Sequence, residues 1–185
     1  ALIFVMLVSI IFAWIYLLPN SLKSFSESLI TSLGFSSNFY FHYTGLEYDA
    51  DNSNLIPLLH TWSLSVEEQF YILFPLIILI FRYKKKIIFS ALFLLLCLSL
   101  VFCIVGSIYF SKINFYLFPT RIWEILIGSL IYFIPNRFSK NNLTSQIGPV
   151  IGLIMILISA SIFNDIDDNF PSHYNLIPTI GAALI

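Results

Sequence analysis

A polar stretch that continues directly into an apolar segment constrains this chain more than any other feature. It reads Pro57-Leu-Leu-His-Thr-Trp-Ser-Leu-Ser-Val-Glu-Glu-Gln-Phe-Tyr71, and the apolar segment after it extends to Phe81. A charged side chain at the centre of a membrane helix costs roughly 2.5–3.5 kcal/mol on insertion scales. Adjacent carboxylates such as Glu67 and Glu68 are rarely kept there for packing alone, so the stretch predicts a functional site within a membrane protein.

The composition places the chain in the class of integral membrane proteins. Of its 185 residues, 58% are hydrophobic and 10% are charged, whereas a soluble domain has about 25% charged residues. No basic stripe with interleaved aromatics occurs, so nothing indicates a nucleic-acid partner. Cys97 and Cys103 lie in an apolar run and are interpreted as small buried hydrophobes. No metal site is predicted, because His42 and His173 have no second ligand at a suitable spacing.

Apolar segments long enough to cross a bilayer, or nearly so, recur along the chain. A span needs about 20 mostly apolar residues, and the segments are 2–18, 62–81, 87–110, 118–134 and 147–163, with a sixth starting near Leu176. No segment alternates like a barrel strand, and lipid offers no partner to exposed backbone groups, so these segments should be helices. We expect an all-α, polytopic transmembrane bundle of five spans plus the start of a sixth. Because apolar runs stand at both ends, we expect the chain to be a middle part of a larger protein.

The charges in the connections predict the orientation of these spans. Connections 82–86 and 135–146 contain Lys and Arg but no acidic residue, whereas 19–56 and 164–175 contain seven acidic residues and one Lys. The positive-inside rule places the first two in the cytoplasm and the other two outside.

The long connection 19–56 contains a helical pattern of its own. Its apolar positions, at helical spacing before Gly34, are Leu22, Phe25, Leu29, Ile30 and Leu33. Serines fill the other face, so we expect an amphipathic helix in the outer interface, or alternatively a loop packed on the bundle. The aromatic stretch 38–43 is predicted to be extended.

The polar residues of two spans are expected to meet. Glu67 and Glu68 lie five and six residues below Trp62, or about 8 Å into the membrane. Arg121 and Glu124 stand three residues apart at the outer start of the fourth span, on one helix face. We predict that these four side chains form one buried polar cluster. The alternative is that the ion pairs only fix helix register, and His60, at the helix entrance, is as consistent with a capping role as with a catalytic one.

The stretch 57–71, with Phe74-Pro75 after it, resembles the signature of the acyltransferase 3 family of bacterial membrane O-acyltransferases. Members of that family acylate sugars of lipopolysaccharide, capsule or other envelope polymers. The segment 115–128, which contains Arg121 and Glu124, is similar to the second recurrent segment of the family, and 175–185 is similar to a third.

The resemblance implies a bundle of about ten transmembrane helices in the bacterial inner membrane. Residues 1–185 would then be part of one membrane-embedded acyltransferase domain, with 19–56 as an extracytoplasmic loop. An acyl-CoA, acetyl-CoA first of all, would be the cytoplasmic donor substrate, no cofactor would be bound, and an envelope glycan would be the acceptor. The family carries its principal His and an Arg on its first helix, which this sequence does not match, so we expect both before Ala1 and an isolated fragment without activity. Glu67, Glu68, Arg121, Glu124 and His60 would then have supporting roles.

Two other functions fit the same residues. Buried acids can relay protons in a transporter or flippase. They can also hold helices together in a membrane assembly subunit without catalysing a reaction.

Overall fold

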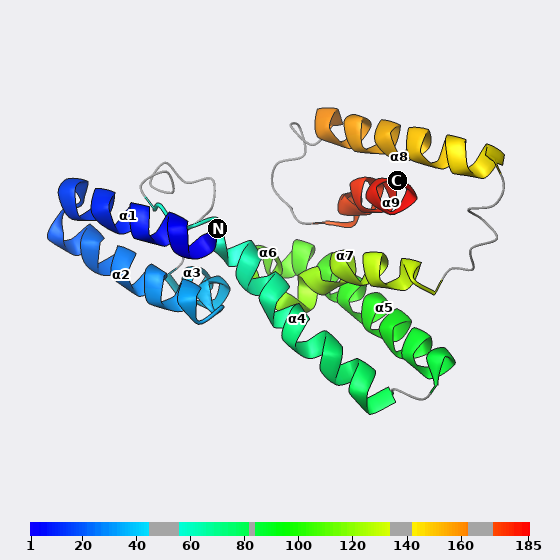
Figure 1. Ribbon diagram of the computed structural model, residues 1–185, viewed down its shortest axis with the longest axis horizontal. Coiled ribbons are helices and arrows are strands. Elements are labelled where there is room, and N and C mark those ends of the chain that lie inside the picture. Colours follow the sequence, from blue (N-terminus) through cyan, green and yellow to red (C-terminus); the bar gives the residue numbers. More distant parts are fainter. Residues whose placement is uncertain (45–55, 82–83, 134–141, 163–171) are drawn as a thin grey trace. The chain divides into compact units, whose positions relative to one another are not determined.

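The computed structural model describes residues 1–44, 56–81, 84–133, 142–162 and 172–185, and every regular element in these ranges is a helix (Figure 1). The all-α expectation is therefore confirmed. The chain divides into two compact units, Ala1–Leu73 and Phe74–Ile185. The helices are α1 Leu2–Tyr16, α2 Pro19–Leu33, α3 Ser37–Thr44, α4 Thr61–Phe81, α5 Lys85–Tyr109, α6 Ser111–Tyr116, α7 Phe118–Ile131, α8 Asn142–Ile162, the 3₁₀ turn η3 His173–Asn175, and α9 Leu176–Leu184.

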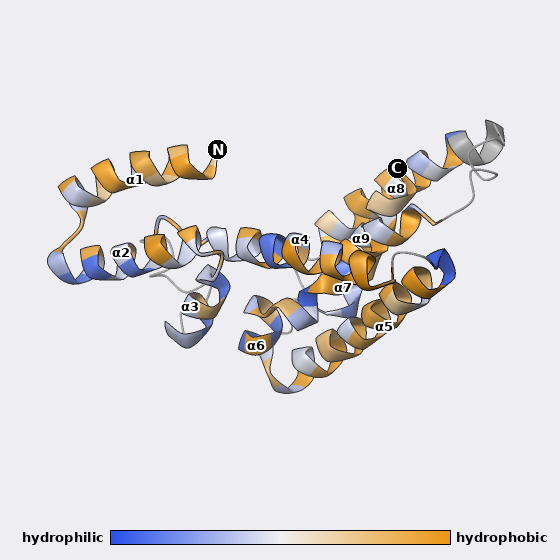
Figure 2. Cartoon of the chain, turned by 60° about the horizontal axis from the view of Figure 1, so that its bottom comes forward, coloured by the Kyte–Doolittle hydropathy of each residue, from blue (hydrophilic) through white to orange (hydrophobic). Residues whose placement is uncertain are grey.

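Two helices, α4 with 21 residues and α5 with 25, are long and apolar enough to cross a membrane. Their predicted spans, 62–81 and 87–110, agree with these bounds to within two residues. Much of the α5 surface is apolar and exposed, as at Leu94 (60%) and Val101 (55%), and Figure 2 shows this helix as predominantly hydrophobic. Such a surface is typical of a helix in contact with lipid or with another helix, and with the spanning length of α4 and α5 it indicates a membrane protein.

The other predicted spans form shorter helices, of which α1 and α8 are apolar. The first, α1, has 15 residues and α7 has 14, while the apolar part of α8 is Gln146–Ile162. The first span was predicted to reach Leu18, but α1 ends at Tyr16 because Leu18 is extended before Pro19. A residue that precedes proline disfavours the helical conformation, and Pro19 then opens α2.

In the first unit, α1 and α2 pack around an apolar core of Met6, Ala13, Phe25 and Leu58. The predicted amphipathic helix is present and its end before Gly34 is confirmed. Its buried face differs from the prediction, since Ser28 and Ser32 are buried whereas Ile30 and Leu33 are 67% and 53% exposed. Each serine hydroxyl donates to a carbonyl of its own helix, so it packs as a small residue with its donor satisfied.

The prediction of an extended segment at 38–43 is wrong, because these residues belong to helix α3. The chain leaves α2 through a turn in which Phe35 N donates to Ser32 O and Ser36 N donates to Thr31 O. This is the Schellman pattern, which requires a left-handed residue, and Phe35 provides it with a φ of 50°. The aromatic composition of this stretch was misleading because the turn, with Ser36 O accepting from Phe39 N, starts a new helix.

In the second unit, α5 packs on α7, α8 packs on α9, and α7 also contacts α9 (Figure 1). Helices α8 and α9 approach closely at Gly152 and Gly181, where a Cβ on Gly181 would lie 2.8 Å from the Gly152 carbonyl oxygen. Small residues allow such backbone approach between membrane helices. Cys103 is fully buried and Cys97 is partly buried.

Candidate functional site

The predicted ion pair lies in the first turns of α7. Arg121 Nη1 is 3.4 Å from Glu124 Oε1, and the two side chains are 11% and 28% exposed. Pro119 stands in the first turn of this helix, where its fixed φ suits a helix and its missing N–H needs no partner. The three-residue spacing then places both side chains on one face, as predicted. The pair is thus a largely buried charge pair at the start of α7.

Helix α6 holds the arginine from a second side. Arg121 Nε donates to the Phe115 carbonyl oxygen at 3.3 Å, and the guanidinium carbon lies 5.3 Å from the centre of the Phe115 ring. An aromatic face attracts a cation at this distance. A carbonyl, a ring and a carboxylate therefore fix the plane of the guanidinium group.

Asn175, the residue before α9, joins the pair. Its Nδ2 donates to Glu124 Oε1 at 3.0 Å, so the same carboxylate oxygen accepts from Arg121 and from Asn175. The sequence prediction missed this residue as part of the site. The available signal was its position as the first residue of the third recurrent segment.

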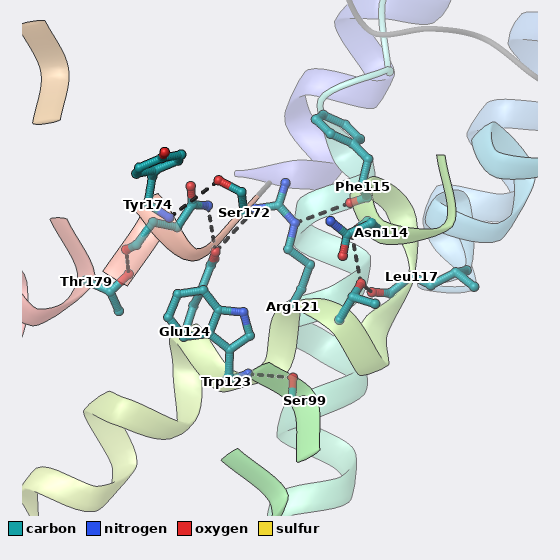
Figure 3. A network of polar contacts seen from close by, with 12 residues as sticks. Ser99, Asn114, Phe115, Leu117, Arg121, Trp123, Glu124, Ser172, Tyr174 and Thr179 are labelled. Atoms are coloured by element: carbon teal, nitrogen blue, oxygen red, sulfur yellow. Dashed lines mark hydrogen bonds and ion pairs between the residues drawn. The ribbon is translucent and has the colours of Figure 1, made fainter. Parts of the chain in front are cut away.

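A serine hydroxyl from α5 fixes the start of α7. Ser99 Oγ donates to the Pro119 carbonyl oxygen at 2.6 Å. The same oxygen accepts from the Trp123 backbone N–H at 3.1 Å (Figure 3). Pro119 and Trp123 are four residues apart, the spacing of an α-helical hydrogen bond. The Ser99 hydroxyl contacts both backbone groups, so it ties the turn that carries Arg121 to the long apolar helix α5.

In the first unit, α4 presents a row of polar side chains at four-residue spacing. Thr61 Oγ1 is 2.7 Å from Ser32 Oγ, and Ser65 Oγ is 2.7 Å from Ser37 Oγ. One turn further, Gln69 Nε2 donates at 2.9 Å to both the Phe35 carbonyl oxygen and Asn38 Oδ1. Part of the polar motif therefore fastens α4 to the turn between α2 and α3, a structural role that the sequence prediction did not assign.

Replacing Gln69 by leucine should destabilise the full-length protein by about 1–3 kcal/mol, because the left-handed Phe35 turn loses the donor to its carbonyl. Gln69→Glu should have the same effect, since a carboxylate accepts but does not donate. The midpoint of thermal unfolding in detergent, followed by tryptophan fluorescence, measures this. Tyr71→Leu on an exposed position of the same helix is the matched control. An unchanged midpoint for Gln69→Leu would contradict the fastening role.

The remaining predicted residues lie in the first unit. Glu67 and His60 are exposed and Glu68 is half-buried within it. The predicted contact of Glu67 and Glu68 with Arg121 joins the two units, so it stays a prediction. The His60 carbonyl oxygen accepts from Ser63 Oγ at 3.1 Å at the entrance of α4.

Helix α3 is also fastened to α2 through its exposed side. Tyr40 Oη donates to Glu27 Oε2 and to the Ser24 carbonyl oxygen, both at 3.2 Å. Burial first, and then the neighbouring Glu27 carboxylate, raise the pKa of Tyr40. The protonated phenol is the form that the fold favours, so its contribution to stability is present below about pH 10 and is lost above it.

Within the described ranges no three His, Cys, Asp or Glu side chains gather as metal ligands. The chemistry on offer is that of a fixed guanidinium, a carboxylate with two donors, and an amide. A cationic donor array of this kind can stabilise negative charge on a reacting oxygen.

Several known proteins are similar in sequence to most of this chain. The chain is 32% identical over 178 residues to an uncharacterized protein of Haemophilus influenzae, covering 90% of the chain and 72% of that protein. It is 31% identical over 170 residues to O-acetyltransferase OatA of Staphylococcus aureus, covering 86% of the chain but only 26% of OatA. It is 28% identical over 148 residues to YrhL of Bacillus subtilis, provisionally named a peptidoglycan O-acetyltransferase, covering 72% of the chain and 22% of YrhL.

No family model matches the chain, and no solved structure matches it. The matched lengths and the sequence identities nevertheless show to which family the chain belongs. The chain belongs to the same family as the Haemophilus protein, an acyltransferase family whose named relatives here are O-acetyltransferases. It spans about a quarter of the length of those named relatives.

Proposed function

We propose that the chain is part of a membrane O-acyltransferase that transfers an acetyl group from a cytoplasmic acyl-CoA to a hydroxyl of an extracytoplasmic envelope glycan. The observation that carries this is the match to OatA over 86% of the chain, since a match of that extent includes both central motifs, 57–71 and 115–128. The name of YrhL points to peptidoglycan as the first glycan to test, before the lipopolysaccharide suggested by the sequence resemblance.

The protein that contains this chain is proposed to be a multi-pass bundle in a bacterial cytoplasmic membrane, of the acyltransferase 3 type. The hydrogen bond between Asn175 and Glu124 supports the alternation of spans, because it brings the start of α9 to the start of α7. With α8 returning between them, both starts belong to the same membrane face. The charges of the connections make that face the outer one. The principal base of the family is expected outside residues 1–185.

In the proposed reaction an ester bond forms between the glycan oxygen and the acyl carbon while the thioester C–S bond breaks. The hydroxyl proton is finally carried by the thiol of CoA, so atoms and charge balance without an oxidant or reductant. Negative charge develops on the acyl oxygen during the transfer. Arg121, fixed by Phe115 and Glu124, is proposed to stabilise that charge, as preorganised donors do in acyl transfer.

The experiment supplies membranes that contain the full-length protein with acetyl-CoA labelled in the acetyl group. Label should appear on the envelope glycan and be released by mild base, which cleaves O-acetyl esters. Movement of substrate driven by a pH gradient, with no label on the glycan, would identify a transporter instead. Absence of both label and transport would overturn the enzymatic proposal in favour of an assembly role.

Glu67→Gln and Glu68→Gln should each abolish glycan acetylation while the protein still inserts, because each removes a charge from the predicted cluster with Arg121. Insertion is measured by protease accessibility of the connections and acetylation by the label. Tyr71→Phe on the same helix is the control. If both variants acetylated the glycan at the wild-type level, Glu67 and Glu68 would not belong to the site. The contacts among Arg121, Glu124 and Asn175 would be unaffected by that result.

A further inference from the structure

The amide of Asn175 is held in one orientation. Its Nδ2 donates to the Glu124 carboxylate at 3.0 Å, which only the nitrogen end of the amide can do. The carbonyl end, Oδ1, is buried and accepts no hydrogen bond within the described part of the chain. The whole residue is 6% exposed. A buried acceptor without a donor is unfavourable, so this oxygen is suited to a donor from a bound molecule.

The position of Asn175 before α9 does not by itself explain this orientation of the amide. Asn175 immediately precedes α9, where an asparagine side chain commonly accepts from the helix N–H groups. Here it makes no such cap and its backbone is helical, with φ −61° and ψ −14°. The side chain turns toward Glu124 instead, so local helix capping does not account for the residue.

The chemistry of the acceptor substrate matches this unoccupied oxygen. A glycan offers hydroxyl groups, which are hydrogen-bond donors, and the outer face assigned above to the starts of α7 and α9 is the face where the glycan lies. An amide oxygen is not a base under physiological conditions, so it can orient a hydroxyl but does not remove its proton. Glu124 contacts the Asn175 amide, and Arg121 donates to the same Glu124 oxygen.

We propose that Asn175 is a substrate-positioning residue whose Oδ1 accepts a hydrogen bond from a hydroxyl of the acceptor sugar. This assignment rests on the proposed function, of which it specifies the acceptor subsite. Glu124 orients the amide, and Arg121 orients Glu124. In this proposal the Phe115 carbonyl oxygen holds Arg121, and Arg121 holds Glu124. The Glu124 carboxylate then orients the amide that binds the sugar hydroxyl.

The test uses the full-length protein in detergent, where both substrates have access. The probes are labelled acetyl-CoA and the envelope glycan of the same cells, cut to soluble fragments and freed of esters by mild base. In Asn175→Ala the KM for the glycan should rise about tenfold, while the KM for acetyl-CoA stays within about twofold. Asn175→Leu replaces the amide with an apolar side chain of similar volume. If Asn175→Ala does not insert into the membrane, the glycan KM of Asn175→Leu tests the proposal in its place.

A swap variant separates recognition from packing. In Glu124→Gln with Asn175→Asp, the new amide donates to the new carboxylate, which keeps an oxygen for the sugar, so the glycan KM should return toward the wild-type value. Ser159→Ala is the matched control, because Ser159 is buried but bonds only within α8. Transfer with unchanged glycan KM in both Asn175→Ala and Asn175→Leu would overturn the assignment alone. A wild-type protein that transfers no label would overturn the proposed function and this subsite with it.

Discussion

Replacing Arg121 by alanine is expected to reduce acetyl transfer to the glycan by about 10²–10³-fold, the usual effect of removing one preorganised donor from an acyl-transfer site. The guanidinium is 11% exposed and is held by Phe115 and Glu124. Its removal also leaves the Glu124 carboxylate with one fewer donor in an apolar setting, which is unfavourable. The loss should therefore appear mainly in kcat, with a smaller loss of stability.

Arg121→Lys distinguishes charge from geometry. Lysine keeps the positive charge but has no planar fork that reaches the Phe115 carbonyl oxygen and the Glu124 carboxylate together. Its activity should lie between those of the wild type and Arg121→Ala. Glu124→Gln, which preserves shape and removes the negative charge, should lower transfer as well, because the arginine loses its charged partner.

The measurement is label on base-treated glycan per inserted protein, so that poor insertion is not mistaken for poor catalysis. Lys86→Gln removes an exposed cation near the start of α5 and serves as the control. If Arg121→Ala transferred acetyl groups at the wild-type level, the ion pair would serve only to fix helix register.

Some parts of this fold follow directly from local sequence. The spans that became α4 and α5 are long apolar runs, so their helices were predicted to within two residues. Gly34 ends α2 where the amphipathic pattern stops. Arg121 and Glu124 were placed together because their spacing of three residues on one helix settles the contact without knowledge of the rest of the chain.

Other parts depend on contacts between distant segments. The hydrogen bond from Asn175 to Glu124 joins residues 51 positions apart, and no helical spacing predicts it. The turn at Phe35 is likewise supported by Gln69, which lies 34 positions away, so the aromatic pattern alone gave the wrong structure for α3. Ser28 and Ser32 were assigned to the polar face because their hydroxyls could not be known to bond within their own helix.

Replacing Gly152 by alanine should destabilise the full-length protein by about 1–3 kcal/mol and lower glycan acetylation as well. A Cβ at this position would collide with the backbone carbonyl of Gly181, so the helices α8 and α9 must move apart. Backbone atoms cannot rotate away as a side chain can. Since α9 begins immediately after Asn175, its displacement should also weaken the hydrogen bond to Glu124.

Gly128→Ala is the matched control, since its Cβ would meet no atom within 4 Å and alanine favours a helix. Thermal unfolding in detergent and label on glycan are measured on both variants. Gly181→Ala should behave like Gly152→Ala, because the contact is reciprocal. If Gly152→Ala lost acetylation but kept its unfolding midpoint, α9 would have moved without loss of stability. The position of α9 would then be necessary for the contact between Asn175 and Glu124. An unchanged midpoint with unchanged acetylation would mean that close packing of α8 and α9 is not needed to place Asn175.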